Sequence, residues 1–358
     1  MIDPLVPSEG ASVWLGSKID YREIGLHELS HADVAEIDGA LAHVNALGPV
    51  DLAALTPALF PLGALGASLR ALGDRLRDGP GFVLLRGLPR ERYALDDLAR
   101  IYAGLGIHLG RLLPQSHQGE LLGHVIDVSD IEDDARGYHA GGAQNMHTDT
   151  CDIVSLMCIR AAKSGGASRI VSAGAVHNRL LETRPDLLAE LYDEIVCRRW
   201  KLDADLGSGV HVKQVVFFSR ATGRLSCNLS GSYPRRAVEF GDTVMSPRLE
   251  AALDELQRLT RSPEFYLDMA IGEGDIQFLN NRVILHGRTA FEDWPDVARR
   301  RHLMRLWLEL PNWPAMPANQ GMHSAADHRG WLRQRTPFME VPTRYLAAMT
   351  ARKAELAA

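Results

Sequence analysis

The chain has 358 residues, of which 46% are hydrophobic and 23% are charged, and its formal net charge is -6 at pH 7. This is the composition of a globular protein that is long enough to bury a large core. The acidic balance argues against a general nucleic-acid binder, which would need a basic patch or stripe. Arginines cluster at residues 298–305, but apolar residues follow at once, so this stretch is not a basic tail.

The first hundred residues are predicted to be mainly helical. Ser30 can cap a helix over residues 31–44. A second helix is indicated by leucines that recur at spacings of three and four, and Gly79-Pro80-Gly81 would end it. Residues 82–88 (FVLLRGL) are typical of a buried strand, and residues 95–110 of a further helix. The leucines of the second helix are Leu62, Leu65, Leu69, Leu72 and Leu76.

From about residue 120 onward the sequence becomes rich in short β-forming runs separated by turn signals. Two helices are expected to interrupt them, one opening at Pro185 and one capped by Ser246. Many short strands with few helices between them favour an antiparallel sandwich or barrel. The runs cover residues 124–128, 153–161, 168–173, 194–200, 213–219, 264–270, 275–280, 282–287 and 302–310.

We expect one domain over residues 1–358, with the mainly helical residues 1–80 packed on the β-rich part. Residues from 311 onward are rich in proline, arginine and polar residues and are expected to wrap the surface. The amino-terminal residues lack the positive and apolar stretches of a signal peptide. No apolar run approaches the length that spans a membrane.

The four cysteines predict a reducing environment. They have no CxxC spacing and are sparse for this length, so free thiols are expected. We therefore predict a cytoplasmic protein with no membrane partner and no nucleic-acid partner. The cysteines are Cys151, Cys158, Cys197 and Cys227.

A candidate metal site begins at His147 and Asp149, in the stretch QNMHTDTC. Side chains two apart share one face of a strand, so both can reach one ion if they lie on or at the edge of a strand. The same spacing at His31 and Asp33 lies inside a predicted helix, where positions two apart do not share a face. A pair alone is weak evidence, since a capped turn explains it equally well.

His286 supplies a third ligand from a distant strand-like run, DIQFLNNRVILHGRTAF. Two imidazoles and one carboxylate on one face form the facial triad of non-haem Fe(II) oxygenases, which leaves positions open for other ligands. On the strand RRRHLMRLWLEL, Arg301 and Arg305 share a face, and an arginine side chain can clamp a carboxylate through two parallel hydrogen bonds. The arginine face could point to solvent, but the interleaved Leu303 and Trp307 favour the interior.

Together these residues resemble the taurine dioxygenase/TfdA family of Fe(II)- and 2-oxoglutarate-dependent oxygenases. The resemblance extends from GPGFVLLRGLP to RLWLEL and is carried by MHTD, KSGGAS, FLNNRVILHGR and RRRHLMRLW. It implies a mainly β fold with helical decoration (α+β), the double-stranded β-helix or jelly roll of the clavaminate synthase-like type. It also implies hydroxylation of a C–H bond, with consumption of 2-oxoglutarate and O2 and release of succinate and CO2.

The resemblance assigns roles to six residues. His147, Asp149 and His286 match the iron ligands, and Arg301 matches the arginine that binds the distal carboxylate of 2-oxoglutarate. Ser168 matches a threonine that hydrogen-bonds the same carboxylate. Arg305 matches a second arginine, near the iron, which serves either the substrate or the co-substrate.

This chain departs from taurine dioxygenase at positions that are expected to contact the substrate. Met146 replaces a tryptophan, Gln144 and Asn145 are shifted from an asparagine, and residues 289–299 form a longer loop. We expect a small substrate, anionic or amino-acid-like, read by Gln144, Asn145, Tyr138 and Arg305. A homo-oligomer, dimer or tetramer, is also expected. Two alternatives stay open: a non-catalytic binding protein on the same fold, and another metalloenzyme such as a zinc hydrolase.

Overall fold

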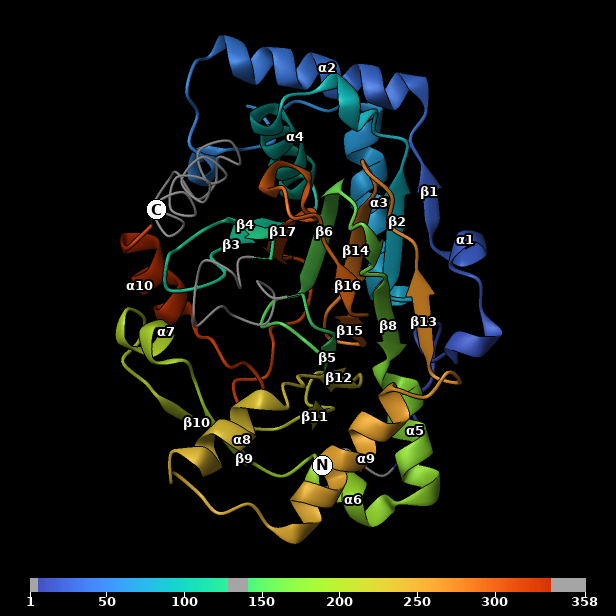
Figure 1. Cartoon of the computed structure of the whole chain (residues 1–358), viewed down its shortest axis with the longest axis vertical. Coiled ribbons are helices and arrows are strands. Elements are labelled where there is room, and N and C mark those ends of the chain that lie inside the picture. The colour runs from blue at the N-terminus through green and yellow to red at the C-terminus, as the bar shows by residue number, and fades with distance from the viewer. Residues whose placement is uncertain (1–5, 128–140, 336–358) are drawn as a thin grey trace.

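Two β-sheets packed face to face form the centre of the molecule, and all of their strand pairs are antiparallel except the parallel pair of β1 and β2 (Figure 1). The computed structural model describes residues 6–127 and 141–335. The major sheet has the strand order β1-β2-β14-β6-β17-β3, with β4 also paired to β17, and the minor sheet has the order β13-β8-β15-β5. The major-sheet strands are β1 (Leu26–Glu28), β2 (Phe82–Arg86), β3 (Arg111–Leu113), β4 (Leu122–Val125), β6 (Ile153–Arg160), β14 (Ile276–Asn280) and β17 (His302–Glu309).

The minor sheet covers one face of the major sheet. Its strands are β5 (Gln144–His147), β8 (Ser168–Ser172), β13 (Tyr266–Met269) and β15 (Ile284–Arg288). Strands that are distant in sequence become neighbours, as in the pairing of β14 with both β2 and β6. The predicted jelly-roll fold class is confirmed. Short two-stranded ribbons complete the β structure: β7 (Ser164–Gly165) with β16 (Phe291–Glu292), β9 (Ile195–Arg198) with β10 (Val212–Val215), and β11 (Phe218–Ser219) with β12 (Ser226–Cys227).

Alternation along the strands explains why both faces of the major sheet are buried. In β14, Leu279 packs between the two sheets, whereas Ile276 and Phe278 pack under the helices on the outer face. Three helices cover that face: α2 (His31–Ala46), α3 (Ala64–Asp78) and α4 (Leu95–Ile107). The Ser30 cap of α2 is present as a full capping box with Asp33.

A second group of helices lies at the opposite end of the molecule (Figure 1). The predicted helix starts at Pro185 and after Ser246 are confirmed. However, four further helices were not predicted, including one that follows β8 directly and is capped by Ser172. The helices at this end are α5 (Ala173–Thr183), α6 (Pro185–Glu190), α8 (Ser232–Glu239) and α9 (Pro247–Thr260). The helices α7 (Lys201–Asp205) and α10 (Ala325–Arg333) lie at one side of the molecule, and a short α1 (Tyr21–Ile24) precedes β1.

The prediction of a surface wrap beyond residue 311 was incomplete, because α10 lies there. Its Trp331 is fully buried, and the Trp331 indole donates to the carbonyl of Asp203 in α7. The helix α10 is therefore packed into the molecule. None of the described helices combines the length and apolar character needed to cross a membrane.

Two glycines in helices offer a matched stability test. A Cβ on Gly104 in α4 would lie 2.5 Å from the buried ring of Phe60, whereas a Cβ on Gly39 in α2 would meet nothing within 4 Å. Gly104→Ala is expected to lower the free energy of unfolding by about 1–3 kcal/mol through overpacking. Gly39→Ala is expected to raise it by about 0.5–1 kcal/mol, because alanine loses less backbone entropy. Urea titration measures both, and changes of the same sign would contradict this packing.

Candidate metal centre and its pocket

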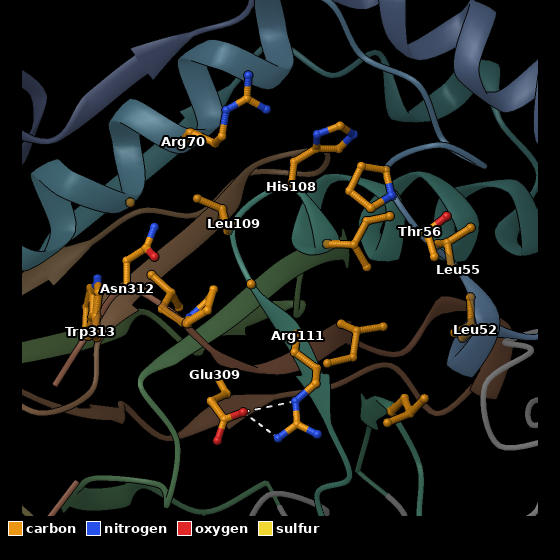
Figure 2. Close-up of a pocket in the computed structure, with 18 of the residues that line it drawn as sticks. Leu52, Leu55, Thr56, Arg70, His108, Leu109, Arg111, Glu309, Asn312 and Trp313 are labelled. Atoms are coloured by element: carbon orange, nitrogen blue, oxygen red, sulfur yellow. Dashed lines mark hydrogen bonds and ion pairs between the residues drawn. The ribbon is translucent and has the colours of Figure 1, made fainter. Parts of the chain in front are cut away.

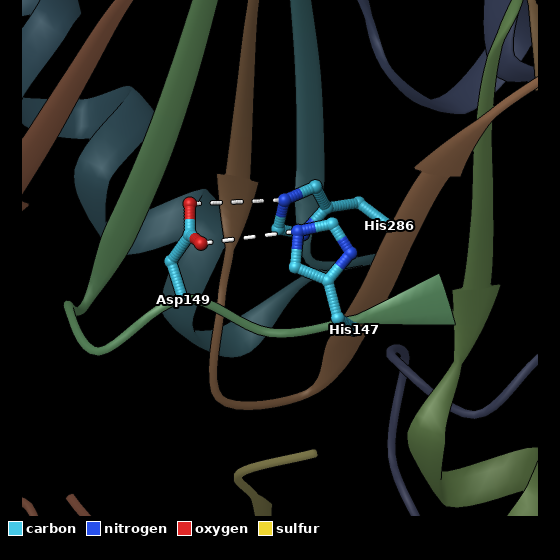
Figure 3. A group of neighbouring side chains, drawn as sticks. All are labelled: His147, Asp149 and His286. Atoms are coloured by element: carbon cyan, nitrogen blue, oxygen red, sulfur yellow. Dashed lines mark ion pairs between the residues drawn. The ribbon is translucent and has the colours of Figure 1, made fainter. Parts of the chain in front are cut away.

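Three potential metal ligands meet at the edge of the minor sheet (Figure 3). His147 ends β5 and His286 lies in β15, directly opposite it in the antiparallel pair. Asp149 lies two residues beyond the end of β5. The Nε2 atom of each histidine lies 3.8 Å from a carboxylate oxygen of Asp149, and one ligand atom from each residue falls within 4.8 Å of the others. Two imidazoles and a carboxylate at this separation can hold one divalent ion.

Hydrogen bonds from distant segments hold the loop that carries Asp149. The Asp149 amide donates to Asn281 Oδ1 at 3.0 Å, and Asn281 Nδ2 donates to the carbonyls of Asp149 and Cys151. Thr148 exchanges hydrogen bonds with the backbone of Leu229, through its amide at 2.7 Å and its hydroxyl at 2.8 Å. The carboxylate thus keeps a fixed position although it lies outside the strand.

A β-bulge separates His147 from Gln144. The three steps from Gln144 to His147 lie opposite only two steps, from His286 to Arg288. In a regular strand, residues three apart face opposite sides; here both side chains line one pocket, with Gln144 Nε2 3.3 Å from His147 Nε2. Gly287 makes the close approach possible, since a Cβ there would lie 2.5 Å from the carbonyl oxygen of Gln144.

The surroundings of Asp149 and His286 keep both side chains in the protonation state that binds a metal ion. Trp307 donates its indole N–H to Asp149 Oδ2 at 2.8 Å, and Arg305 Nη1 lies 3.8 Å from the same oxygen. Burial alone would raise the pKa of Asp149, but the charge of Arg305 and the nearby histidines keep it below its usual value. Burial, then the neighbouring His147, lowers the pKa of His286 to about 3, so this imidazole is neutral and available as a ligand near pH 7.

Arg305 lies on the inner face of β17, as the interleaved apolar residues indicated. Gln115 holds it: Gln115 Oε1 accepts from Arg305 Nε at 2.7 Å, and Gln115 Nε2 donates to the Arg305 carbonyl at 2.8 Å. Gly123 lies opposite Arg305 in register, and a Cβ there would be 2.7 Å from Gln115 Oε1. Sequence reasoning missed Gln115, because its partner is 190 residues away.

Arg301 and Ser168 lie near the turn formed by Gly165 and Gly166, both of which have positive φ. Arg301 Nη2 donates to the carbonyl of Gly166 at 3.4 Å. Its side chain is buried, and burial lowers the pKa of its guanidinium. Ser168 is also buried and lies opposite Arg288 in the pairing of β8 with β15. The structure thus brings a buried cation and a buried hydroxyl to the same turn.

Arg288 adds a second guanidinium at this place. The guanidinium carbon of Arg288 lies 4.8 Å from the centre of the Phe291 ring, and that of Arg301 lies 5.1 Å from it. Burial, and then the charge of Arg301, lowers the pKa of Arg288 to about 10. Arg288 Nη2 also donates to the Gly142 carbonyl at 3.2 Å. Two neighbouring buried cations also favour an anion beside them.

A cavity of about 980 Å³ opens beside the three ligands. Gln144, Asn145 and Arg305 line it, as expected of substrate contacts, whereas Tyr138 lies outside the described residues. Asn145 Oδ1 accepts from Arg261 Nη2 at 2.9 Å. The cavity wall also includes Tyr233 and Arg235. Sequence reasoning did not assign four further wall residues to a substrate site: Trp200, Asn228, Arg261 and His323.

A second cavity, of about 810 Å³, lies between α3, the connection from α4 to β3, and the residues after β17 (Figure 2). Its wall is mostly apolar, and the ion pair of Arg111 with Glu309 crosses its rim. Within the described ranges, the one group of three metal-ligating side chains is that of His147, Asp149 and His286, and two of its members, His147 and Asp149, line the other cavity. The chemistry therefore belongs to the cavity beside β5.

A double-stranded β-helix with two histidines and one carboxylate at its open edge defines a class of protein, the non-haem iron oxygenases. The chain belongs to one family of this class. Residues 51–307 match the family described as "Taurine catabolism dioxygenase TauD, TfdA family". The predicted family is therefore confirmed, and the chain is a 2-oxoglutarate-dependent non-haem iron oxygenase, which favours that reading over the two alternatives left open by the sequence.

Curated relatives support this membership. The chain is 33% identical over 309 residues to a taurine hydroxylase-like protein, SAT17, of Stachybotrys chartarum, covering 82% of this chain and 77% of the relative. It is 27% identical over 329 residues to the FR-33289 synthase of Streptomyces rubellomurinus, covering 88% and 94%. A uridine-5'-phosphate dioxygenase of an Amycolatopsis species is 28% identical over 207 residues, covering 54% and 72%.

Solved structures share the fold. An asparagine oxygenase in complex with Fe(II), 3-hydroxyasparagine and succinate has a TM-score of 0.62 at 18% identity, covering 79% of this chain and 93% of that chain. The oxygenase OrfP in complex with Fe and alpha-ketoglutaric acid has a TM-score of 0.57 at 16% identity, covering 79% and 94%. Likeness at this identity establishes the double-stranded β-helix for this chain.

Proposed function

We propose that the chain hydroxylates an unactivated C–H bond of a small substrate that carries an acidic group and resembles an amino acid. His147, Asp149 and His286 would hold Fe(II), and Arg301 and Ser168 would bind the distal carboxylate of 2-oxoglutarate. When iron and 2-oxoglutarate are bound, they supply the oxidising chemistry with O2, which releases succinate and CO2.

The observation that carries this proposal is the buried Arg301 guanidinium, which lies at the Gly165-Gly166 turn next to the charge of Arg288. Its one hydrogen bond to a described residue is the 3.4 Å contact with Gly166. A buried charge is costly unless it is paired, so a guanidinium in this state is suited to an anion that arrives from outside. The planar fork of arginine matches a carboxylate, and 2-oxoglutarate presents one at the end remote from the metal.

Arg305 would serve the substrate. It lines the same cavity as Gln144 and Asn145, whereas Arg301 and Ser168 are not part of that wall. The described wall carries five arginines but only two aspartates, one of which is the metal ligand Asp149. This balance favours an anionic substrate group. It fits relatives whose names refer to taurine and to uridine-5'-phosphate, and a fold neighbour bound to hydroxyasparagine.

The test is substrate-dependent release of succinate from 2-oxoglutarate with Fe(II) under air, across amino acids, sulfonates, carboxylic acids and nucleoside monophosphates. We expect succinate to rise with at least one anionic compound, which gains one oxygen atom. A protein that binds Fe(II) but never consumes 2-oxoglutarate would contradict the proposal. Metal-dependent hydrolysis of an ester or amide without succinate would instead support the hydrolase alternative.

We also propose that the chain works as one domain, with residues 1–80 as its helical part, in the cytoplasm and as a dimer or tetramer. The packing of α2 and α3 into the same core as β14 and β17 supports one domain. The four buried cysteines are all free thiols, which fits a reducing compartment. Light scattering of the purified protein tests the oligomeric state.

A further inference from the structure

The Ser168 hydroxyl has a single proton, and in the structure it already donates that proton in a hydrogen bond to Gln277. Ser168 Oγ donates to Gln277 Oε1 at 2.9 Å, and both side chains are buried. An ionised carboxylate can only accept hydrogen bonds. Ser168 therefore cannot donate to 2-oxoglutarate while its proton is held by Gln277.

Gln277 is placed so that it can release this proton. It lies in β14, and its side chain reaches across from the major sheet to Ser168 in the minor sheet. Its amide Nε2 donates to the sulfur of Met269 at 3.0 Å, and a thioether is a weak acceptor. A half-turn of the Gln277 amide exchanges the positions of its oxygen and nitrogen. Only the hydrogen bond from Nε2 to the Met269 sulfur is lost by this rotation.

We propose that Gln277 is a positioning residue that sets the direction of the Ser168 hydrogen bond. With its amide turned, Gln277 Nε2 donates to Ser168 Oγ, and the Ser168 proton points to the distal carboxylate of 2-oxoglutarate beside Arg301. The inference rests on the proposed function, because it assumes that Ser168 binds this carboxylate. No bond is made or broken; only the donor and acceptor roles change.

A double-mutant cycle tests the proposal through the affinity for 2-oxoglutarate, measured by calorimetry on the Mn(II)-loaded full chain. In the otherwise native protein, Ser168→Ala is expected to weaken binding by roughly tenfold or more, the loss of one hydrogen bond to a charged group. In a Gln277→Glu background the carboxylate keeps the Ser168 proton, so Ser168→Ala is expected to have almost no further effect. In a Gln277→Met background no amide oxygen holds the Ser168 proton, so Ser168→Ala should again weaken the binding of 2-oxoglutarate.

The cycle separates this role from simple charge repulsion, because the charge of Gln277→Glu is present in both members of its pair and cancels. Ser155→Ala is the control: its hydroxyl bonds the backbone carbonyl of Gln277 at 2.9 Å, and 2-oxoglutarate affinity should be unchanged. Equal Ser168→Ala effects in all three backgrounds, or none in the native one, would overturn the proposal. Failure of the native protein to bind 2-oxoglutarate at all would instead overturn the proposed function.

Discussion

His147→Ala and His286→Ala are each expected to lower the affinity for Fe(II) by more than roughly 100-fold, since removal of even an outer partner of a metal ligand costs about 10–100-fold. The two imidazoles come from opposite strands and the carboxylate from a pinned loop, so neither neighbour can replace a missing ligand. Anaerobic titration with Fe(II) and metal analysis after dialysis would measure the loss.

The chain contains its own control for this experiment. His31 and Asp33 repeat the spacing of His147 and Asp149, but they lie in α2 and His31 is exposed. His31→Ala should bind Fe(II) as the native protein does. Native-like metal affinity in both the His147 and His286 variants would show that the three side chains are not the metal ligands.

Arg301→Ala is expected to abolish the use of 2-oxoglutarate while the fold and the metal affinity are retained. Truncating one partner of a buried charge pair costs about 2–5 kcal/mol, which corresponds to roughly 30-fold to several-thousand-fold in affinity. The affinity of Arg301→Lys for 2-oxoglutarate should lie between that of the native protein and that of Arg301→Ala, because lysine keeps the charge but cannot form two parallel hydrogen bonds. Calorimetry with 2-oxoglutarate on the Mn(II)-loaded protein gives the dissociation constants.

Arg299→Ala is the matched control for Arg301. Arg299 lies two residues earlier, is exposed, and its guanidinium carbon stacks 3.6 Å from the centre of the Trp294 ring. Its loss should leave 2-oxoglutarate affinity unchanged. If Arg301→Ala bound 2-oxoglutarate as tightly as Arg299→Ala, another residue would have to be the partner of the distal carboxylate, with Arg288 the next to test.

Local sequence signals predicted much of the fold, because caps and periodic leucines act over a few residues. Ser30 and Ser246 cap the helices that they were expected to cap. The helix α5 was missed because the strand-like run assigned to residues 168–173 covered its cap, Ser172, and its first residue, and because a glycine follows at position 174. Ser172 with three small residues after it was the signal that could have indicated this helix.

In the candidate site too, local features could be predicted from the sequence, whereas contacts between distant residues could not. The ligand triad could be proposed from spacing, since strands place alternate residues on one face. The pairs of Gln115 with Arg305 and of Ser168 with Gln277 could not, because they join residues 190 and 109 positions apart. Such contacts depend on strand order and register, which no short motif encodes. Neither glutamine lies in a pattern that distinguishes it from an ordinary strand or turn residue.

The bulge in β5 (Gln144–His147) separates the residues that form the cavity wall from the residue that pairs with His286. Because one extra residue is taken up between Gln144 and His147, the cavity wall formed by residues 144–146 is uncoupled from the pairing that places His147 opposite His286. We therefore expect that substitutions at residues 144–146 change the wall of the cavity, while His147 stays opposite His286.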